Sequence, residues 1–370
     1  MCFKSVGTDK ISAYFSAFSF PTDFDSDNQP LSRYNYEQLS ETEKQAYICV
    51  FNNIQSHPDY IKIPKLTKEE FNNVYFAVKN DNPHLLCFSD SCNMITFWAS
   101  AFLELHYDYG REECDSMQEL MLSEVDSIVS QMTEINDSYS KELYIHNYII
   151  NNCAYEETEH SSNAYGCLID KKAVCSGYSR AVMLLLDRVG IESSLVGGTG
   201  ISESQGQVSH MWNIVWLDGE PYHLDVTWDD PGSESDLAVS HMYFNLTAAE
   251  ISFDHSDFTL GFDCDSERYN YFRYNNLYFY SYGKTELKMI QTVLLNNINN
   301  GINYLEIQFD DAEQYEKAAA AIIDGTSPSS DMYKIIAYIS ANADDKVDIT
   351  HVNFARDDNK NYIRLMFDWK

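Results

Sequence analysis

The chain is poor in positive charge. Of its 370 residues, 25 are Lys or Arg and 57 are Asp or Glu, so the formal net charge is −32. Nucleic acid and anionic lipid surfaces would be repelled by this balance, so neither is expected as a partner. A cationic or neutral substrate is compatible with it, although a strongly solvated surface is the simpler interpretation. No run of about 18 apolar residues occurs either, so no membrane span is expected.

Closely spaced cysteine pairs are also missing. The chain has nine cysteines, but none of them form a C-x-x-C pair, so zinc ligation is not expected. No other metal and no cofactor are expected. The odd number and the scattered spacing are more typical of a reduced protein than of a disulfide scaffold. Four disulfides among the eight cysteines other than Cys175 remain the alternative.

The first residues, MCFKSVGTDK, contain no apolar signal segment, which favours a cytoplasmic location. The alternative rests on Cys2. A cysteine at this position is what would remain if a lipoprotein signal peptide were replaced by a start methionine, and the protein would then be secreted or lipid-anchored.

The length of the chain predicts two or more domains, and no internal repeat or low-complexity segment is visible. Capping boxes that start at Ser40 and Thr67 predict helices through about Ser56 and Val78. Strands are predicted at 84–88 and within 97–109, and helices at 116–133 and 138–152. After Phe258 the composition changes, and the remainder predicts helices at 285–299, 311–324 and 331–341 with strands at 303–309, 348–355 and 361–369. We therefore predict a mainly helical region over 1–110, a core over 111–258 and a small α+β module over 259–370.

The segment KKAVCSGYSRAVMLLLDRVGI, residues 171–191, places a cysteine at the start of a helix. Apolar residues recur at helical spacing from about residue 176, so Cys175 falls at the N-terminal edge. Unpaired backbone N–H groups and the positive end of the helix dipole lower the pKa of a cysteine there. Gly177 has no side chain, which lets another backbone or a substrate come close.

Downstream, VSHMWNIVWLDGEPYHLDVTWDDP, residues 208–231, predicts a β-hairpin with Asp218 and Gly219 as its turn. A two-residue loop makes His210 and Asp225 diagonal neighbours on one face of the hairpin. A four-residue loop shifts the pairing by two residues, which keeps both side chains on the same face. A three-residue loop would put them on opposite faces. The hairpin is therefore expected to present an imidazole beside a carboxylate.

Thiol catalysis needs this combination of groups. His210 would take the proton of Cys175, and Asp225 would orient the imidazole through its other ring nitrogen. The thiolate would attack an amide or ester carbonyl to give a thioester, with a backbone N–H at the helix start stabilising the oxyanion. Water or an amine would then release the acyl group.

Three segments, KAVCSGYSRA, SHMWNIVWLDG and YHLDVTWDDP, resemble the transglutaminase-like cysteine superfamily, and the upstream KELYIHNYIINNCAYEE and NAYGCLIDK resemble its bacterial branch. The resemblance covers roughly residues 140–231. It implies an α+β fold with a papain-like or transglutaminase-like core, Cys175 as nucleophile, His210 as base and Asp225 as orienting acid. It also implies that Trp212 and Trp228 wall the substrate site, with Tyr165 as a weaker candidate for helping the oxyanion.

The family does not choose the reaction, because it holds transglutaminases, peptidases, deglycosylases and members without known activity. We expect hydrolysis of an amide bond in a peptide or protein substrate, possibly a cell-wall peptide, because nothing in the sequence marks an amine site. The alternatives are amine transfer to a glutaminyl side chain and a catalytically silent peptide- or glycan-binding protein. The papain-type C-G-[SA]-C-[WY] signature is absent, which sets that group aside.

The other chemically suggestive residues are expected to be structural. Buried, packed or exposed positions are expected for Cys49, Cys87, Cys114, Cys153, Cys167, Cys264, His146, His241, His255 and His351. His223 shares a face with Asp225 and could rival His210 as the base. The acidic residues Asp229, Asp230, Glu234 and Asp236 lack calcium-loop spacing, so a solvated loop is expected, with the first two capping a turn. The tyrosines 269, 271, 274, 278, 280 and 282 are expected to fill a sheet face rather than to stack on a ligand.

Overall fold

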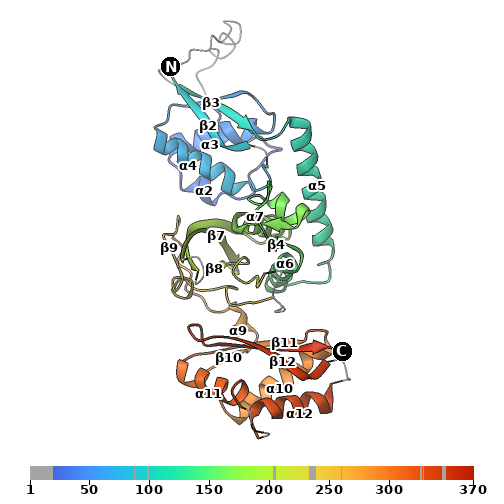
Figure 1. Cartoon of the computed structure of the whole chain (residues 1–370). Coiled ribbons are helices and arrows are strands. Elements are labelled where there is room, and N and C mark those ends of the chain that lie inside the picture. Colours follow the sequence, from blue (N-terminus) through green and yellow to red (C-terminus); the bar gives the residue numbers. More distant parts are fainter. Residues whose placement is uncertain are drawn as a thin grey trace. The chain divides into compact units, whose positions relative to one another are not determined.

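The computed structural model describes residues 20–86, 88–97, 100–202, 206–232, 239–259, 261–325, 327, 329–343 and 347–370. Cys2, Cys87, Glu234 and Asp236 lie outside these residues. Two compact units are present, one of residues 1–221 and 254–262 and the other of residues 222–253 and 263–370. Each contains helices and strands (Figure 1), as the predicted α+β class requires. The three-part division of the chain remains a prediction. Within the described ranges, no helix combines the length and hydrophobicity that crossing a bilayer requires.

The first unit begins with a small sheet covered by helices. Helices α2 (Tyr34–Glu37), α3 (Glu41–Ile54) and α4 (Lys68–Asp81) accompany strands β1 (Tyr60–Pro64), β2 (Phe88–Thr96) and β3 (Ser100–Tyr107), which pair antiparallel in the order β1-β3-β2. The capping boxes predicted at Ser40 and Thr67 are both present. The strand predicted over 84–88 is wrong for residues 84–86, which form a turn and irregular chain. Strand β1 was not predicted.

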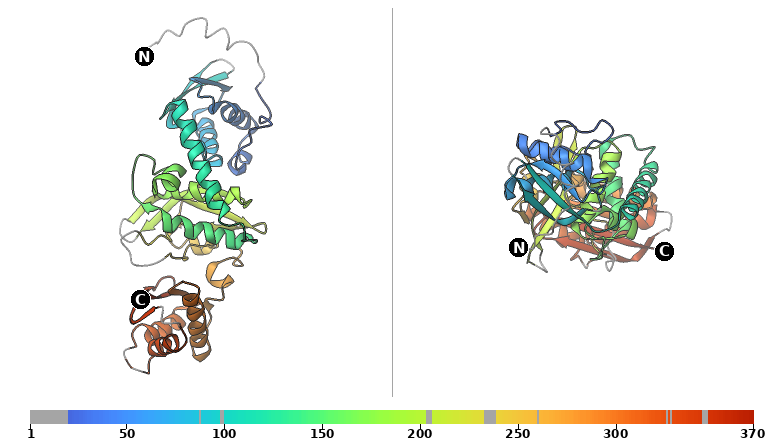
Figure 2. Two further views of the ribbon diagram at one scale, coloured as in Figure 1. Left: turned by 90° about the vertical axis from the view of Figure 1, so that its right-hand side faces the viewer. Right: turned by 90° about the horizontal axis from the view of Figure 1, so that it is seen from above.

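The same unit continues with a helical layer. It comprises α5 (Arg111–Ser130), α6 (Ser138–Asn152), a π-helix (Gly166–Asp170) and α7 (Cys175–Arg188), with the two-residue strands β4 (Ala154–Tyr155) and β5 (Lys172–Ala173). Helix α7 packs against β6 (Ser193–Ser202) and β7 (Gly206–Leu217), and α5 and α6 lie against α7 (Figure 2). The inner face of α7 is apolar, and Ala181, Val182 and Leu185 on it are fully buried. The predicted helix after Cys175 is confirmed.

A four-stranded sheet adjoins α7, in the order β8-β7-β6-β9, where β8 is Glu220–Leu224 and β9 is His255–Ser256. Strands β7 and β8 are joined by Asp218 and Gly219 alone, and these residues have positive φ angles of 52° and 83°. Both central residues of a type I′ turn require φ > 0, which Asp tolerates and Gly adopts without strain. The predicted two-residue hairpin is therefore confirmed.

The second unit contains a four-stranded sheet with helices packed on it (Figure 1). Its strands are β10 (Tyr278–Phe279), β11 (Tyr304–Phe309), β12 (Val347–Asp357) and β13 (Tyr362–Trp369), in the order β10-β11-β13-β12. The pairing of β12 with β13 shifts register between Asp348 and Val352. Helices α10 (Lys284–Asn299), α11 (Ala312–Ile322) and α12 (Asp331–Asn342) cover an apolar core, and α8 (Ala248–Ile251) and α9 (Tyr271–Tyr274) precede them. All the helices and strands predicted after residue 284 are confirmed.

The tyrosines between residues 269 and 282 of the second unit differ in how deeply they are buried. Tyr282 is buried and Tyr271 and Tyr278 are half-buried, but Tyr274 and Tyr280 are exposed. The expectation that these rings fill a sheet face therefore holds only for part of the set. Arg273 lies over the ring of Tyr278, 3.9 Å from its centroid, which uses that face in a cation–π contact.

The cysteines are not all reduced. Cys114 is disulfide-bonded, whereas disulfides do not involve Cys49, Cys92, Cys153, Cys167, Cys175 or Cys264. The interpretation of the chain as a reduced protein is therefore wrong at Cys114. Cys49, Cys153, Cys167 and Cys264 are buried, as expected for small apolar residues.

Candidate active site

Cys175 is the first residue of α7 and is half-buried. The residue before it, Val174, provides no side-chain cap for the helix. A helix start carries backbone N–H groups without intrahelical partners, together with the positive end of the dipole, and both attract negative charge. The chain therefore places this thiol at the end of α7 that attracts negative charge.

Gly177 explains how a neighbouring loop approaches this helix start. A Cβ atom at residue 177 would lie 2.3 Å from the carbonyl oxygen of Ser161 and 2.8 Å from Cβ of Ala173. The same Ser161 oxygen accepts a hydrogen bond of 2.9 Å from the backbone N–H of Val174. The expectation that Gly177 allows a close backbone approach is confirmed, and the approaching chain fixes the residue just before Cys175.

The hydroxyl of Ser179 connects α7 to strand β7. Its Oγ lies 2.8 Å from the carbonyl oxygen of Cys175 and 2.9 Å from that of Met211, so its proton can be given to either. The amide of Asn213 donates to the carbonyl of Ser179 at 3.0 Å. These bonds place the first turn of α7 beside the part of β7 that carries His210.

His210 lies on β7 and is 6% exposed. Trp212 follows two residues later on the same face of the strand, and the two rings stack with centroids 5.8 Å apart. Trp212 is completely buried, and its ring meets His255 edge-on at 4.9 Å. In this structure the ring of Trp212 is a support for the histidines, so its contact with a substrate remains a prediction.

Asp225 comes directly after β8 and has no exposed surface. Its Oδ1 accepts hydrogen bonds from the backbone N–H groups of Thr227 and Trp228, at 3.1 and 3.2 Å. A carboxylate that accepts such bonds folds the chain behind it into a tight turn. Trp228 thereby contacts Asp225 through its backbone, while its ring meets Tyr243 edge-on at 5.3 Å.

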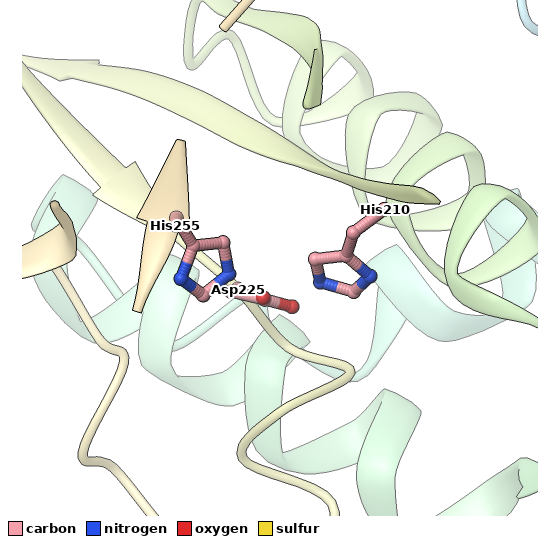
Figure 3. Close-up of side chains that lie close together, drawn as sticks. All are labelled: His210, Asp225 and His255. Carbon is pink, nitrogen blue, oxygen red and sulfur yellow. The ribbon is translucent and has the colours of Figure 1, made fainter. Parts of the chain in front are cut away.

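His210, Asp225 and His255 form one buried cluster (Figure 3). One nitrogen or oxygen atom from each side chain lies within 4.8 Å of the others. The structure thus brings together two of the three residues predicted for catalysis and adds a second histidine. The hydrogen bond of 2.7 Å between Nδ1 of His255 and Oδ1 of Asp254 orients that second ring.

Sequence reasoning missed the position of His255, which was expected to be structural or exposed. It is 1% exposed and lies on the two-residue strand β9, opposite Gly200 of β6. A strand of two residues leaves no periodic pattern to find. The only available signal was the Asp254–His255 pair itself, because a carboxylate beside a histidine often orients a functional ring.

The same cluster has the composition of a transition-metal site. Two imidazoles and a carboxylate are ligands for Zn²⁺ and similar ions, and Asp254 occupies the supporting position that a metal-binding histidine usually has. The expectation that the protein holds no metal was based on cysteine spacing, and it remains a prediction.

Tyr165 precedes the π-helix, and its ring meets that of His160 edge-on at 5.2 Å. His160 is in turn held by Asp170, with Nδ1 and Oδ2 2.6 Å apart. This network orders the loop before α7. A role of Tyr165 at the oxyanion remains a prediction.

The remaining histidines and acidic residues mostly have structural surroundings. His146 is buried against Asn147, and His223 is buried and paired through its backbone with Leu246. The side chain of His351 is 73% exposed. Asp230 caps a turn by accepting from Gly232 N–H at 2.8 Å, as expected. Asp229 is fully buried, so the interpretation of it as part of a solvated loop is wrong.

Residues 126–226 match the family model described as the transglutaminase-like superfamily. This segment contains Cys175, His210 and Asp225. Among curated proteins, none matches the chain.

The solved structures that are similar to this chain over part of their length include three bacterial or enzyme-related ones. They are a proposed cysteine protease from Cytophaga hutchinsonii (14% identity, 35% of this chain and 51% of that one, TM-score 0.26), a TGase (13%, 48% and 53%, 0.28) and a proposed protease from Parabacteroides distasonis (9%, 37% and 36%, 0.23). The chain thus spans about half the length of the first two.

Proposed function

Because the chain carries a core of the transglutaminase-like superfamily, we propose that it is a thiol-dependent acyl-transfer enzyme that hydrolyses an amide bond in a peptide or cell-wall peptide. The observation that carries the proposal is the start of α7. A free, half-buried thiol occupies its first residue, and the hydroxyl of Ser179 bonds that turn to the strand of His210.

In the proposed reaction, His210 accepts the proton of the Cys175 thiol, and the sulfur forms a bond to the substrate carbonyl carbon. The negative charge on the carbonyl oxygen is stabilised at the N-terminus of α7. The C–N bond then breaks, and the leaving amine takes the proton from His210. Water, deprotonated by the same histidine, hydrolyses the thioester and restores the thiol.

Asp225 has the role of holding the imidazole in this scheme. A buried carboxylate stabilises the imidazolium and selects the ring nitrogen that faces the thiol. Its Oδ1 already accepts two backbone hydrogen bonds, which fix the position of the carboxylate. Amine transfer to a glutaminyl side chain would use the same residues with an amine in place of water. A silent binding protein would hold a peptide or glycan without the proton transfer.

The test is the rate of iodoacetamide labelling of individual cysteines by mass spectrometry, from pH 4 to 9. Cys92 is an internal reference, because it is free and partly exposed, and burial raises the pKa of its thiol to about 11. A thiolate–imidazolium pair predicts that Cys175 labels faster than Cys92 below pH 7. His210→Ala should remove this advantage, whereas the exposed His351→Ala should not.

If Cys175 in the folded wild-type protein labels no faster than Cys92 below pH 7, the proposal of an active thiol fails and the silent binding protein is favoured. Incorporation of dansylcadaverine into casein would favour amine transfer over hydrolysis. A wild type that labels at low pH but incorporates no amine supports hydrolysis.

A further inference from the structure

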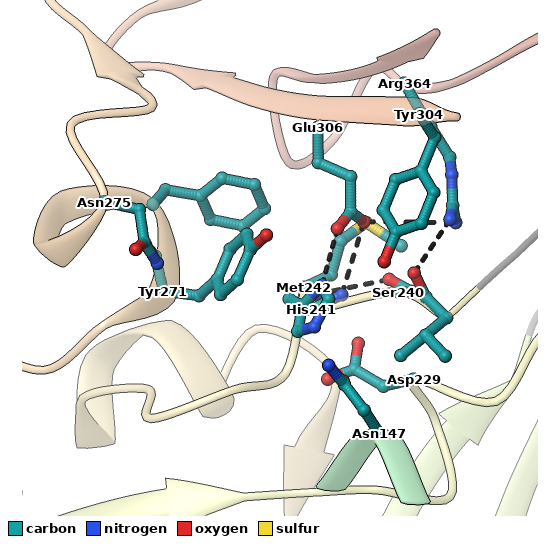
Figure 4. Close-up of polar contacts among 12 residues, drawn as sticks. Asn147, Asp229, Ser240, His241, Met242, Tyr271, Asn275, Tyr304, Glu306 and Arg364 are labelled. Carbon is teal, nitrogen blue, oxygen red and sulfur yellow. Dashed lines mark hydrogen bonds and ion pairs between the residues drawn. The ribbon is translucent and has the colours of Figure 1, made fainter. Parts of the chain in front are cut away.

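A buried charged cluster lies in the second unit, away from solvent and without an assigned role (Figure 4). Glu306 of β11 is 1% exposed, and Arg364, its register partner on β13, is 2% exposed. Burying a charged pair in a sheet seldom stabilises it more than apolar side chains of the same volume would. The presence of Glu306 therefore calls for an explanation other than stability.

Both carboxylate oxygens of Glu306 contact His241, which is distant from Glu306 in the sequence. Its Oε2 lies 2.6 Å from Nδ1 of His241, and its Oε1 accepts the backbone N–H of His241 at 3.3 Å. The hydroxyl of Tyr362 donates to Oε1 at 2.6 Å. The His241 ring also stacks on Tyr271 at 3.9 Å, so both its ring and its backbone are fixed.

Burial acts to raise the pKa of Glu306, but the neighbouring His241, Arg364 and Tyr362 outweigh it and lower that pKa below its usual value. The residue is therefore an ionised carboxylate inside the unit. Arg364 adds a second connection to the same segment, because its Nη2 donates to the carbonyl of Val239 at 2.8 Å.

The segment held in this way supports the backbone of Asp225. The N–H of Asp225 donates to the carbonyl of Tyr243 at 3.1 Å, and His223 exchanges two backbone hydrogen bonds with Leu246. The carboxylate of Asp229 accepts the N–H of Tyr243 at 3.0 and 3.1 Å. The carbonyl of Asp229 also accepts from Ser240 N–H at 3.1 Å. The turn from Asp225 to Asp229 is thus held at both ends by residues 240–246.

From these contacts we propose that Glu306 is a positioning residue for the acyl-transfer reaction: by holding His241, it fixes residues 240–246 and thereby the position of Asp225. The inference rests on the proposed function, since it gives the module after residue 259 a role in that reaction. It explains why a buried glutamate occupies the centre of β11, at a position where an apolar residue would complete the sheet.

Glu306→Gln tests the inference, because it replaces one of the two acceptor oxygens by an NH2 group, which cannot accept a hydrogen bond from His241. The measurement is the pH dependence of iodoacetamide labelling at Cys175 in the full chain, with Asp225→Asn as the reference for a lost orienting acid. We expect Glu306→Gln to follow Asp225→Asn, with an apparent pKa higher by about one unit and labelling about tenfold slower at pH 6.

Tyr362→Phe is the matched control. It removes one hydrogen bond from the same buried carboxylate but leaves both bonds to His241, so it should cost stability without changing the pH profile. His241→Asn supplies the conservative rescue, since its amide nitrogen can replace Nδ1 as donor, whereas His241→Ala cannot. We expect His241→Asn to label like the wild type and His241→Ala to label like Asp225→Asn. If Glu306→Gln does not fold, the comparison of His241→Asn with His241→Ala tests the positioning role instead.

The two proposals fail in different ways. If the wild type shows no low-pH labelling of Cys175, the active thiol is refuted and the positioning role falls with it. If wild type and Asp225→Asn differ but folded Glu306→Gln and His241→Ala both follow the wild type, the active thiol stands and the positioning role alone is refuted. A pH profile that shifts equally in Tyr362→Phe would also overturn the inference, because it would reduce the effect to stability.

Discussion

Replacing Gly177 by alanine should damage the start of α7 more than a single methyl group would elsewhere. The new Cβ would lie 2.3 Å from the Ser161 carbonyl oxygen, a distance that real Cβ atoms essentially never show. The obstacle is backbone, and it cannot rotate away as a side chain end would. Moving it stretches the hydrogen bond from Val174 N–H to Ser161, which sets the residue before Cys175.

The loss of stability expected for Gly177→Ala is the sum of three contributions. Overpacking of a buried site costs about 1–3 kcal/mol. Loss of the Val174–Ser161 hydrogen bond adds about 1 kcal/mol. The better helix propensity of alanine returns up to about 1 kcal/mol. We expect the free energy of unfolding of this part of the chain to fall by about 2 kcal/mol, which corresponds to about 4–8 °C in Tm for a unit of this size.

Guanidinium unfolding and the labelling rate of Cys175 at pH 6 are the two assays. Gly261→Ala is the matched control, because nothing lies within 4 Å of a Cβ atom there. Gly177→Ala should lose both stability and fast labelling, whereas Gly261→Ala should keep both. A Gly177→Ala protein with wild-type stability and wild-type labelling would refute the reasoning, since the loop would then yield without cost.

Two further predictions concern pH and metal. Burial raises the pKa of Asp81 from its ordinary 3.8 to about 6, so between these values the folded state keeps a proton that the unfolded state has released. Stability should therefore fall by about 3 kcal/mol over the whole titration, about 2 kcal/mol of it between pH 4 and 6, and level off above about pH 7. In urea unfolding the difference in free energy between wild type and Asp81→Asn should change by this amount, and a difference independent of pH would contradict it. Zn²⁺ bound by the cluster of His210, Asp225 and His255 would occupy the proposed base, so Zn²⁺ but not Mg²⁺ should slow labelling of Cys175 at pH 6. His255→Ala should raise the Zn²⁺ concentration needed by at least about tenfold, and equal sensitivity in both proteins would exclude His255 as a ligand.

Much of the fold was predictable because its local signals are strong. The capping boxes at Ser40 and Thr67 and the Asp218–Gly219 turn depend on short-range bonds and backbone preferences, and all are present. The hairpin then fixed which residues of β7 share a face. Because face follows from strand parity alone, His210 and Asp225 could be placed in one cluster without tertiary information.

The features that were missed depend on distant packing. Strand β1, YIKIP, is short and contains a proline, and it is recognisable only beside β3. In β11, apolar residues alternate with polar ones, and this pattern predicts that Glu306 faces solvent. In the structure residues 239–243 cover Glu306, and His241, which bonds to it, is 65 positions away in the chain. His255 likewise gains its place from pairing with β6.

The register shift in β12 has a consequence for how molecules of this protein meet one another. Of the two edges of the second unit's sheet, β10 offers two residues, and β12 offers a long row of backbone donors and acceptors interrupted between Asp348 and Val352. An uninterrupted edge is a template on which a strand from a second molecule can pair. The irregularity, together with the charged residues Arg356 and Asp357 at the far end, shortens the straight portion that is left. A second chain would therefore find fewer consecutive partners along this edge than an uninterrupted strand of the same length would offer.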